Sequence, residues 1–131
     1  MVYICGTKLN TIEDIVYNID NTKILGNKTC IITGCNLNDS PEGWIETIIV
    51  KDGKHKRIAS HKVDIAMVGT GDFFAALVIS QLAYGKQINV AVEFASDIVS
   101  KTLDYSTKHR YSEMNSESIM AVLGQEIFNQ K

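Results

Sequence analysis

Two glycines, a threonine and an aspartate stand directly before a long apolar segment. The run is Gly69-Thr70-Gly71-Asp72, and residues 73–84 after it are almost all apolar. Glycines one residue apart let the backbone approach a ligand closely, and the first N–H groups of a helix have no acceptor within that helix. Because these N–H groups point outward at the positive end of the helix dipole, the run is typical of an anion site.

Asp72 is unusual in an anion site, since a carboxylate competes with a bound phosphate unless it has a task of its own. One such task is to accept a proton from an attacking hydroxyl while the backbone amides hold a transferring phosphoryl group. A tight turn with Asp in the first helical turn, where Asp is favoured anyway, also explains the four residues. Taken alone, they leave both interpretations open.

Helices are predicted to follow this turn in the second half of the chain. Residues 73–84 are apolar on nearly every side, which is typical of a buried helix, and Gly85 is expected to end it. A second helix is predicted over residues 89–107. A third is expected to start at a Ser116 cap and to carry one apolar face, formed by Ile119, Leu123 and Ile127.

The first half mixes strands with one helix. Residues 12 to about 24 are predicted to be helical, with Thr11 as the N-cap and Asp14 three residues later, and Gly26 is the expected stop. The apolar, β-branched run 29–33 favours a parallel strand that is buried on both faces. Residues 44–50 and 55–61 are predicted strands, joined by a tight turn at Asp52-Gly53.

Composition limits the class of protein. The chain has 131 residues, 14.5 kDa and a formal net charge of −2, which predicts one compact domain and no general nucleic-acid binder. No run of eighteen apolar residues is present, so no membrane span is expected. The first residues do not form a charged leader with an apolar core, so we expect a cytoplasmic protein.

Two further groups of residues are candidate sites. Cys30 and Cys35 are five residues apart, but no second Cys or His pair lies at ligand spacing, so small buried side chains are favoured over a metal site. The basic residues of 54–62 favour a solvated hairpin over a nucleotide-facing patch. His109 is given no role.

Residues 62–76 resemble the signature region of pyridoxal kinases, in the ribokinase-like superfamily. The segment reads Lys-Val-Asp-Ile-Ala-Met-Val-Gly-Thr-Gly-Asp-Phe-Phe-Ala-Ala. Thr70 between the glycines, and the Lys-Val-Asp upstream, favour the pyridoxal kinase branch, since sugar kinases more often have Ala there. Residues 31–34 resemble the family's strand that ends in Thr-Ser, and residues 3–6 resemble its Leu-Ser-Gly turn.

The resemblance implies a role for each matching residue. Asp72 would be the general base that activates the 5′-hydroxymethyl group of a B6 vitamin, and would therefore contact the substrate. Gly69, Thr70 and Gly71 would form the anion hole for the γ-phosphate in flight. The implied ATP-binding positions are Thr33, Gly34, His61, Lys62, Val63 and Thr70. Gly34 stands where the family usually has Ser, and His61 where it often has Arg.

The resemblance also implies an α/β, ribokinase-like fold of which this chain covers the C-terminal half as a single partial domain, residues 1–131. We expect one buried parallel strand, an antiparallel hairpin and about four helices. The implied cofactors are ATP and Mg²⁺, with a monovalent cation such as K⁺ as a further candidate, and no metal ligand is assigned within the chain.

The rest of such a fold would supply the vitamin pocket and most of the sheet. We therefore expect the isolated chain to form a homodimer, to pair with a complementing N-terminal half, or to be marginally stable. Two alternatives to a pyridoxal kinase stay open. One is another ribokinase-like kinase, for a sugar or a hydroxymethylpyrimidine, and the other is a non-catalytic remnant that acts as an interaction module.

Overall fold

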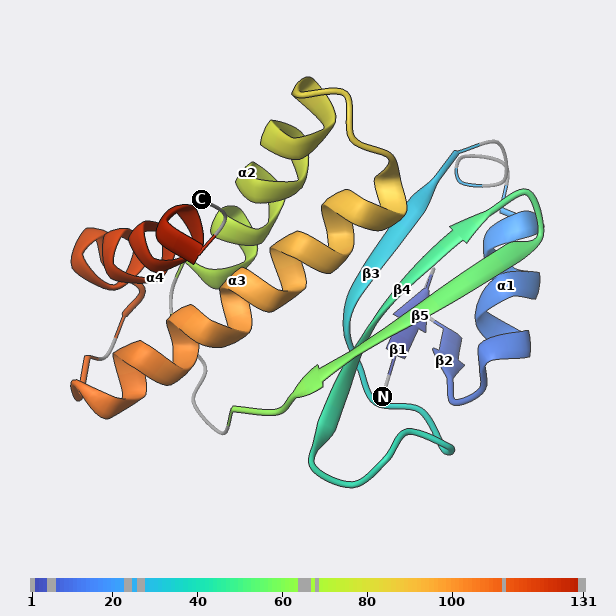
Figure 1. Ribbon diagram of the computed structural model, residues 1–131. Coiled ribbons are helices and arrows are strands. Elements are labelled where there is room, and N and C mark those ends of the chain that lie inside the picture. Colours follow the sequence, from blue (N-terminus) through green and yellow to red (C-terminus); the bar gives the residue numbers. More distant parts are fainter. Residues whose placement is uncertain are drawn as a thin grey trace. The chain divides into compact units, whose positions relative to one another are not determined.

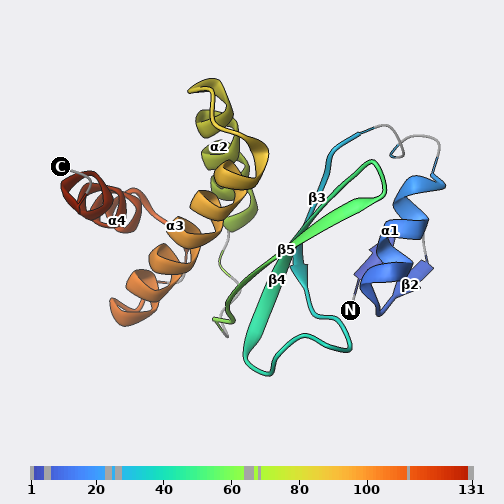
Figure 2. The same ribbon diagram turned by 45° about the vertical axis from the view of Figure 1, so that its right-hand side comes forward.

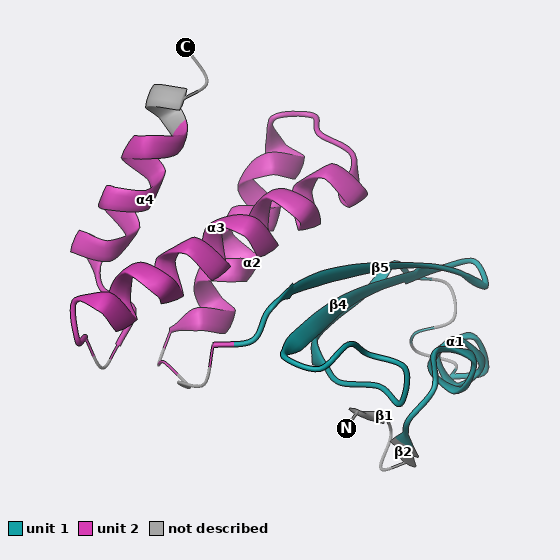
Figure 3. Cartoon of the chain, turned by 60° about the horizontal axis from the view of Figure 1, so that its bottom comes forward, with its two compact units in different colours: residues 1–62 teal, residues 63–131 magenta. Residues whose placement is uncertain are grey.

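The computed structural model describes residues 2–4, 7–22, 25, 28–63, 67, 69–111 and 113–129. The chain divides into two compact units, residues 1–62 and 63–131 (Figure 3). Unit 1 contains β1 (Val2–Ile4), β2 (Thr7–Leu9), α1 (Ile12–Asp20), β3 (Cys30–Cys35), β4 (Trp44–Lys51) and β5 (Lys54–His61). Unit 2 contains α2 (Thr70–Ala83), α3 (Ile88–Lys108) and α4 (Ser116–Asn129). None of the described helices is long and apolar enough to cross a membrane.

Unit 1 is built on an antiparallel sheet in the order β3-β4-β5, with α1 packed against it (Figures 1 and 2). Ile12, Ile15 and Ile19 recur at helical spacing and are all buried. They form one cluster with Ile48 and Val50 of β4, while Ile49 between these two points to the other face of the sheet and is buried as well. β1 and β2 add a short antiparallel pair that the sequence did not predict.

The ends of α1 follow local chemistry. The Thr11 hydroxyl accepts a hydrogen bond from the amide of Asp14 at 3.2 Å, which confirms the predicted N-cap. The expected extension to about residue 24 is wrong, because Asn21 caps the C-terminus: its backbone and side-chain N–H groups both donate to the carbonyl of Tyr17. The predicted stop at Gly26 lies outside the described residues.

The turn between β4 and β5 also forms as predicted. Asp52 and Gly53 both have positive φ, 51° and 72°, which is the backbone of a type I′ turn. Lys51 and Lys54 pair directly across it, and the register then continues to Trp44 and His61. The hairpin therefore returns the chain to the end of the sheet where β4 begins.

The strand predicted at residues 29–33 forms, as β3, but its pairing was predicted wrongly. It pairs antiparallel with β4 and is only partly buried, whereas a parallel strand covered on both faces was expected. A β-branched run favours a strand without fixing its direction. Eight residues separate β3 from β4, and such a connection is short of the dozen or more residues that a parallel crossover needs.

Unit 2 is a set of three helices in which α3 contacts both α2 and α4. The buried residues of α3 include Ala91, Ala95, Ile98 and Thr102, at helical spacing, as the sequence predicted. Toward its end, the Ser106 hydroxyl donates to the hydroxyl of Ser118 on α4 at 2.9 Å in a buried position. The two helices are thus joined by a polar contact as well as by apolar packing.

Two expectations for unit 2 need correction. Only Leu77 and Val78 of α2 are buried, so α2 is not the fully buried helix that its composition indicated. The cap of α4 is Asn115 and not Ser116, because the Asn115 side-chain oxygen accepts the amide hydrogen of Ser118 at 2.9 Å. Asn and Ser are comparably good N-cap residues, so the sequence alone does not show which of these two adjacent residues caps α4.

Candidate active site

The Gly69–Asp72 run forms the first turn of α2. Gly69 is the N-cap and has φ 92°, ψ −6°, a left-handed conformation that favours glycine. Its carbonyl accepts the first helical hydrogen bond, from Phe73 at 3.0 Å. The amides of residues 70–72 therefore have no acceptor within the helix, and no side-chain cap satisfies them.

This turn is open. Gly69, Gly71 and Asp72 are exposed, and a Cβ added at either glycine would meet no atom within 4 Å. The glycine at 69 is required by the backbone angle, whereas the glycine at 71 has ordinary helical geometry and only leaves space. A burial of this stretch in the core, which would have excluded an anion site, is not observed.

Thr70 fixes the entry to the turn. Its hydroxyl donates to the carbonyl of Met67 at 2.8 Å, and Met67 is buried at 7% exposure. The Thr70 side chain is half-buried, so the contact ties the first helical residue to the segment that precedes the turn. The lone pairs of the hydroxyl oxygen stay available, but its proton is already used.

Asp72 lies in the first turn of α2 with an exposed side chain. Within the described part of the chain, its carboxylate has no ion pair and no hydrogen bond. The positive end of the helix dipole stabilises a negative charge at this position. A free carboxylate beside unsatisfied amides is the arrangement that the predicted chemistry needs, and a solvated first-turn Asp would look the same.

Thr33 and Gly34 form a β-bulge at the end of β3. The register moves from Ile32 opposite Ile48 to Cys35 opposite Glu46, so three steps on β3 match two on β4. Gly34 supplies the positive φ of 68° that this irregularity needs, and both bulge residues are exposed. Bulges of this kind are common next to active sites, where they redirect a side chain.

His61 and Lys62 follow the last pairs of β5. The His61 ring lies 4.0 Å from the Trp44 ring, centroid to centroid, and the Lys62 amide donates to the carbonyl of Gly43 at 2.9 Å. The antiparallel order places the end of β3, the start of β4 and the end of β5 at one end of the sheet. The structure therefore brings Thr33 and Gly34 to the same sheet end as His61 and Lys62.

The remaining predicted positions belong to unit 2. Val63 is half-buried and opens that unit, and Gly69, Thr70, Gly71 and Asp72 follow as one continuous turn. Residues 64–66 and 68 of the signature region lie outside the described residues. The site residues thus form two groups, one in each unit.

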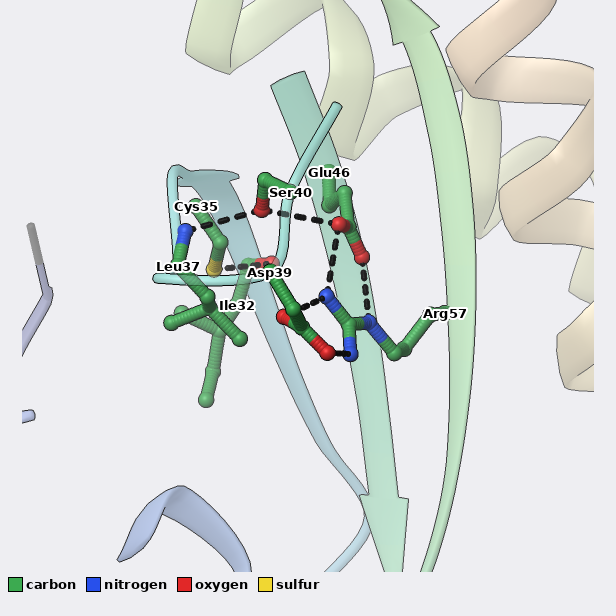
Figure 4. A network of polar contacts seen from close by, with 7 residues as sticks. All are labelled: Ile32, Cys35, Leu37, Asp39, Ser40, Glu46 and Arg57. Atoms are coloured by element: carbon green, nitrogen blue, oxygen red, sulfur yellow. Dashed lines mark hydrogen bonds and ion pairs between the residues drawn. The ribbon is translucent and has the colours of Figure 1, made fainter. Parts of the chain in front are cut away.

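A cluster of charges on the sheet of unit 1 was not predicted from the sequence. Arg57 donates to both carboxylate oxygens of Glu46, and to both oxygens of Asp39 at 2.8 Å (Figure 4). Glu46 also accepts a hydrogen bond from the Ser40 hydroxyl, which in turn accepts one from the amide of Leu37. The cluster ties the loop of residues 36–43 to β4 and β5.

Burial and charge follow from this geometry. Glu46 is only 4% exposed, so its charge is stabilised by the guanidinium that faces it. The hydrogen bonds from Arg57 lower the pKa of both Glu46 and Asp39. Burial, with the nearby Glu46 charge as a second cause, raises the pKa of the Cys35 thiol to about 11. Cys35 is thus a buried thiol, as predicted, whereas Cys30 is only partly buried.

A sequence signal for the cluster did exist. Arg57 pairs with Ile48 across the sheet, so it points to the same buried face as Ile48 and Val50. The expectation of a wholly solvated basic hairpin is wrong for this residue, while Lys54 and His55 are exposed as expected. In the described residues, no group of three or more His, Cys, Asp or Glu side chains could hold a metal ion.

An α/β chain with an exposed Gly-x-Gly-Asp turn at the start of a helix is what the resemblance to the ribokinase-like kinases implies. Solved structures agree with this class. A Bacteroides thetaiotaomicron protein assigned as a phosphomethylpyrimidine kinase matches with a TM-score of 0.74 at 15% identity over 88% of this chain and 40% of its own. The likeness shows the fold, so the predicted fold class is confirmed.

The chain belongs to the phosphomethylpyrimidine kinase family, whose sequence profile matches residues 1–116. A pyridoxal kinase from Leifsonia xyli subsp. xyli is 24% identical over 106 residues, which are 78% of this chain and 38% of that protein. Plasmodium falciparum pyridoxal kinase, solved with AMP-PNP and PL, matches with a TM-score of 0.62 at 21% identity over 90% of this chain and 41% of its own. The resemblance to the pyridoxal kinases is thereby confirmed, and the chain spans about 40% of the length of these relatives.

Proposed function

We propose that this chain contributes the base and the nucleotide-binding part of an ATP-dependent kinase that phosphorylates the 5′-hydroxymethyl group of pyridoxal, pyridoxine or pyridoxamine. The observation that carries the proposal is the open turn at Gly69–Asp72, where unsatisfied amides adjoin an unpaired carboxylate among the described residues. The chain would act as one partial domain of the cytoplasmic enzyme, and the family match supports a phosphotransferase.

The reaction needs little covalent help from the protein. The substrate hydroxyl oxygen attacks the γ-phosphorus, the bond from that phosphorus to the bridging oxygen breaks, and ADP leaves with the electron pair. The amides of residues 70–72 stabilise charge on the transferring group, and Asp72 accepts the hydroxyl proton. Because phosphoryl transfer is loose, positioning and charge neutralisation carry most of the rate.

The resemblance assigns nucleotide contacts to residues of each group, which are taken here unit by unit. Thr33 and Gly34 on the bulge, with His61 and Lys62 at the same end of the sheet, offer a hydroxyl, backbone amides and a lysine ammonium to phosphate oxygens. Val63 and Thr70 are the positions that the resemblance adds from unit 2. Gly34 in place of the usual Ser removes one hydroxyl donor, so we expect weaker nucleotide binding than in the pyridoxal kinases.

Metal ions belong to the expected chemistry of the family, and the resemblance assigns no ligand for them within this chain. Mg²⁺ is commonly held by nucleotide phosphates together with one or two carboxylates. The described residues contain no cluster of candidate ligands, and neither Mg²⁺ nor K⁺ is given a ligand here.

A second acceptor is favoured by a specific finding. The family profile and the Bacteroides relative both carry the description phosphomethylpyrimidine kinase, so a hydroxymethylpyrimidine is the alternative substrate. A substrate panel separates the two, with phosphate transfer to each B6 vitamer and to the pyrimidine measured side by side. Transfer to the pyrimidine alone would overturn the vitamin assignment and keep the kinase.

The test of the site replaces Asp72 in an assembled enzyme. This chain is grafted in place of the matching region of the Leifsonia pyridoxal kinase, and Asp72→Asn is compared with Asp104→Asn, an exposed carboxylate on α3. We expect Asp72→Asn to lower kcat by roughly 10²-fold or more, with ATP binding retained.

Two results would overturn the assignment. If the kcat of Asp72→Asn stays within a few-fold of that of the unchanged graft, as the kcat of Asp104→Asn is expected to do, then Asp72 only stabilises the start of the helix. If the graft folds and binds no ATP, the chain is a remnant that keeps the fold and has lost the chemistry.

A further inference from the structure

The loop of residues 36–43 joins the two parts of unit 1 that carry candidate nucleotide-binding residues. It begins directly after β3, whose bulge carries Thr33 and Gly34, and it ends where β4 begins. At that second end, the carbonyl of Gly43 accepts the amide hydrogen of Lys62 at 2.9 Å. The placement of this loop therefore affects both parts.

Arg57 on β5 holds this loop by its middle. The guanidinium donates two hydrogen bonds of 2.8 Å to the two carboxylate oxygens of Asp39, and two more to Glu46 (Figure 4). Asp39 is 66% exposed, whereas Glu46 is buried. A bidentate pair fixes both side chains in one geometry, but an exposed pair contributes little to stability. The Asp39 contact thus constrains the loop more than it stabilises the fold.

The buried partner of Arg57 lies next to the bulge. Glu46 is opposite Cys35, which is the first pair after the register shift, and Cys35 is fully buried. The Cys35 thiol donates back across the bulge to the carbonyl of Ile32 at 3.5 Å. The guanidinium of Arg57 therefore connects the loop, at Asp39, with the residue pair that closes the bulge.

We propose that Asp39 and Arg57 are positioning residues for the nucleotide, whose ion pair fixes the loop of residues 36–43 and thereby the bulge at Thr33 and Gly34. This inference rests on the proposed function and names residues that act on ATP binding without contacting ATP. The physical reason is preorganisation, because a loop that is ordered before binding loses less conformational freedom when the phosphates bind.

Charge and geometry predict opposite effects for the removal of Asp39. A carboxylate on the same unit repels the phosphates of a nucleotide, so electrostatics alone predicts that its neutralisation tightens ATP binding. Loss of the ion pair should instead release the loop and weaken ATP binding. The sign of the change in Kd therefore separates the two effects.

The test compares Asp39→Asn with Glu42→Gln. Glu42 lies in the same loop, is exposed, and has no ion pair or hydrogen bond among the described residues, so both variants remove one negative charge and only the first breaks the contact. Arg57 stays in place, because its loss would leave Glu46 buried without a cation. Amide hydrogen exchange is measured on the whole chain without ATP, and the Kd, KM and kcat for ATP are measured in the grafted enzyme.

Two amides report the loop directly. The Leu37 amide donates to the Ser40 hydroxyl, and the Lys62 amide donates to the carbonyl of Gly43. We expect Asp39→Asn to speed exchange at both amides about tenfold. In the graft it should raise the Kd and KM for ATP by roughly 3–10-fold, with kcat changed by less than about twofold.

The other variants complete the test. Glu42→Gln should leave amide exchange unchanged and should not weaken ATP binding. Asp39→Glu restores a carboxylate for Arg57 and should recover most of the lost affinity. Urea midpoints of all three variants should stay close to that of the unchanged chain, so that a weaker Kd does not reflect unfolding.

Three outcomes overturn the inference while the proposed function stands. Unchanged exchange in Asp39→Asn shows that the ion pair does not hold the loop. Faster exchange with an equal or tighter Kd shows that the loop does not position the nucleotide site. A lower kcat with an unchanged Kd assigns Asp39 to the chemistry.

The proposed function fails by a different result. If the unchanged graft is folded and binds no ATP, the kinase assignment is refuted, and the role of Asp39 in nucleotide binding is refuted with it. Amide exchange in the whole chain then still decides whether the ion pair orders the loop.

Discussion

Replacing Arg57 tests whether the buried charge cluster stabilises unit 1. Arg57→Met keeps much of the side-chain length but removes the guanidinium that faces Glu46 and Asp39. Glu46 is 4% exposed and would keep only the hydrogen bond from Ser40. A buried carboxylate without its cation is costly, because its charge has lost both water and its partner.

The magnitude follows from the geometry. Breaking a buried pair by removing one partner costs about 3–5 kcal/mol. Arg57 is 24% exposed and Ser40 still donates to Glu46. We therefore expect a loss at the lower end of this range, about 3 kcal/mol in the free energy of unfolding. With a urea m-value of roughly 1–3 kcal/mol/M, the midpoint should fall by about 1–3 M.

The single tryptophan makes the assay local. Trp44 is the first residue of β4 and its ring contacts the ring of His61 at the end of β5, so its fluorescence reports the unfolding of the sheet in unit 1. Urea titrations of the whole chain, followed by this fluorescence, give the midpoint for each variant. Circular dichroism at 222 nm, followed in parallel, reports the helices of both units.

Two variants make the result interpretable. Asp39→Asn removes the outer, 66% exposed partner of Arg57 and should leave the midpoint nearly unchanged. Glu46→Leu added to Arg57→Met removes the stranded charge and should recover most of the loss. If Arg57→Met lowers the midpoint no more than Asp39→Asn does, the cluster does not stabilise the unit and the reasoning is refuted.

Three smaller predictions can be checked in the same way. Arg57 lowers the pKa of Glu46 in the folded chain, so in acid the unfolded chain binds more protons than the folded chain does. The free energy of unfolding should therefore be highest above about pH 5 and fall below it. Urea midpoints from about pH 3 to 7 should show this decrease, and Arg57→Met should make it smaller. Gly69→Ala should lower the free energy of unfolding by about 1–2 kcal/mol, because position 69 has a φ of 92°. Gly71→Ala, in open helical backbone, should raise it by about 0.5–1 kcal/mol. Thermal melts distinguish the two variants, and equal effects would contradict the backbone argument. Ser96→Ala removes a buried hydroxyl that has no partner in the described residues, and should raise stability by about 1 kcal/mol in urea melts; a loss would mean that the hydroxyl is satisfied.

Local chemistry explains what the sequence could predict. The Thr11 cap and the Asp52-Gly53 turn depend on a few adjacent residues, and both form as expected. The turn at Gly69 also depends on a few adjacent residues, because a left-handed glycine at the start of a helix leaves the first amides of the helix without an acceptor in it. For this reason the backbone of the candidate site could be predicted, although the roles of its residues stay proposals.

Longer-range features depended on information that adjacent residues do not hold. The direction of β3 was set by its short connection to β4, and its β-branched run would have suited either direction. The polar neighbours of Arg57 in the sequence favour a solvated side chain, yet the sheet register turns it toward Glu46 and Asp39. Both errors concern partners across the sheet, which adjacent residues do not identify, although the register counted from the Asp52-Gly53 turn places Arg57 opposite Ile48.

The wrong expectation that α2 is buried on every side has another origin, because it came from the composition of the helix and not from a missing partner across the sheet. Residues 73–84 have the composition of a helix that is buried on every side, and yet Ile79 is mostly exposed. In the described residues only Leu77 and Val78 of α2 are buried, so the apolar composition predicted the helix without determining which of its faces is covered.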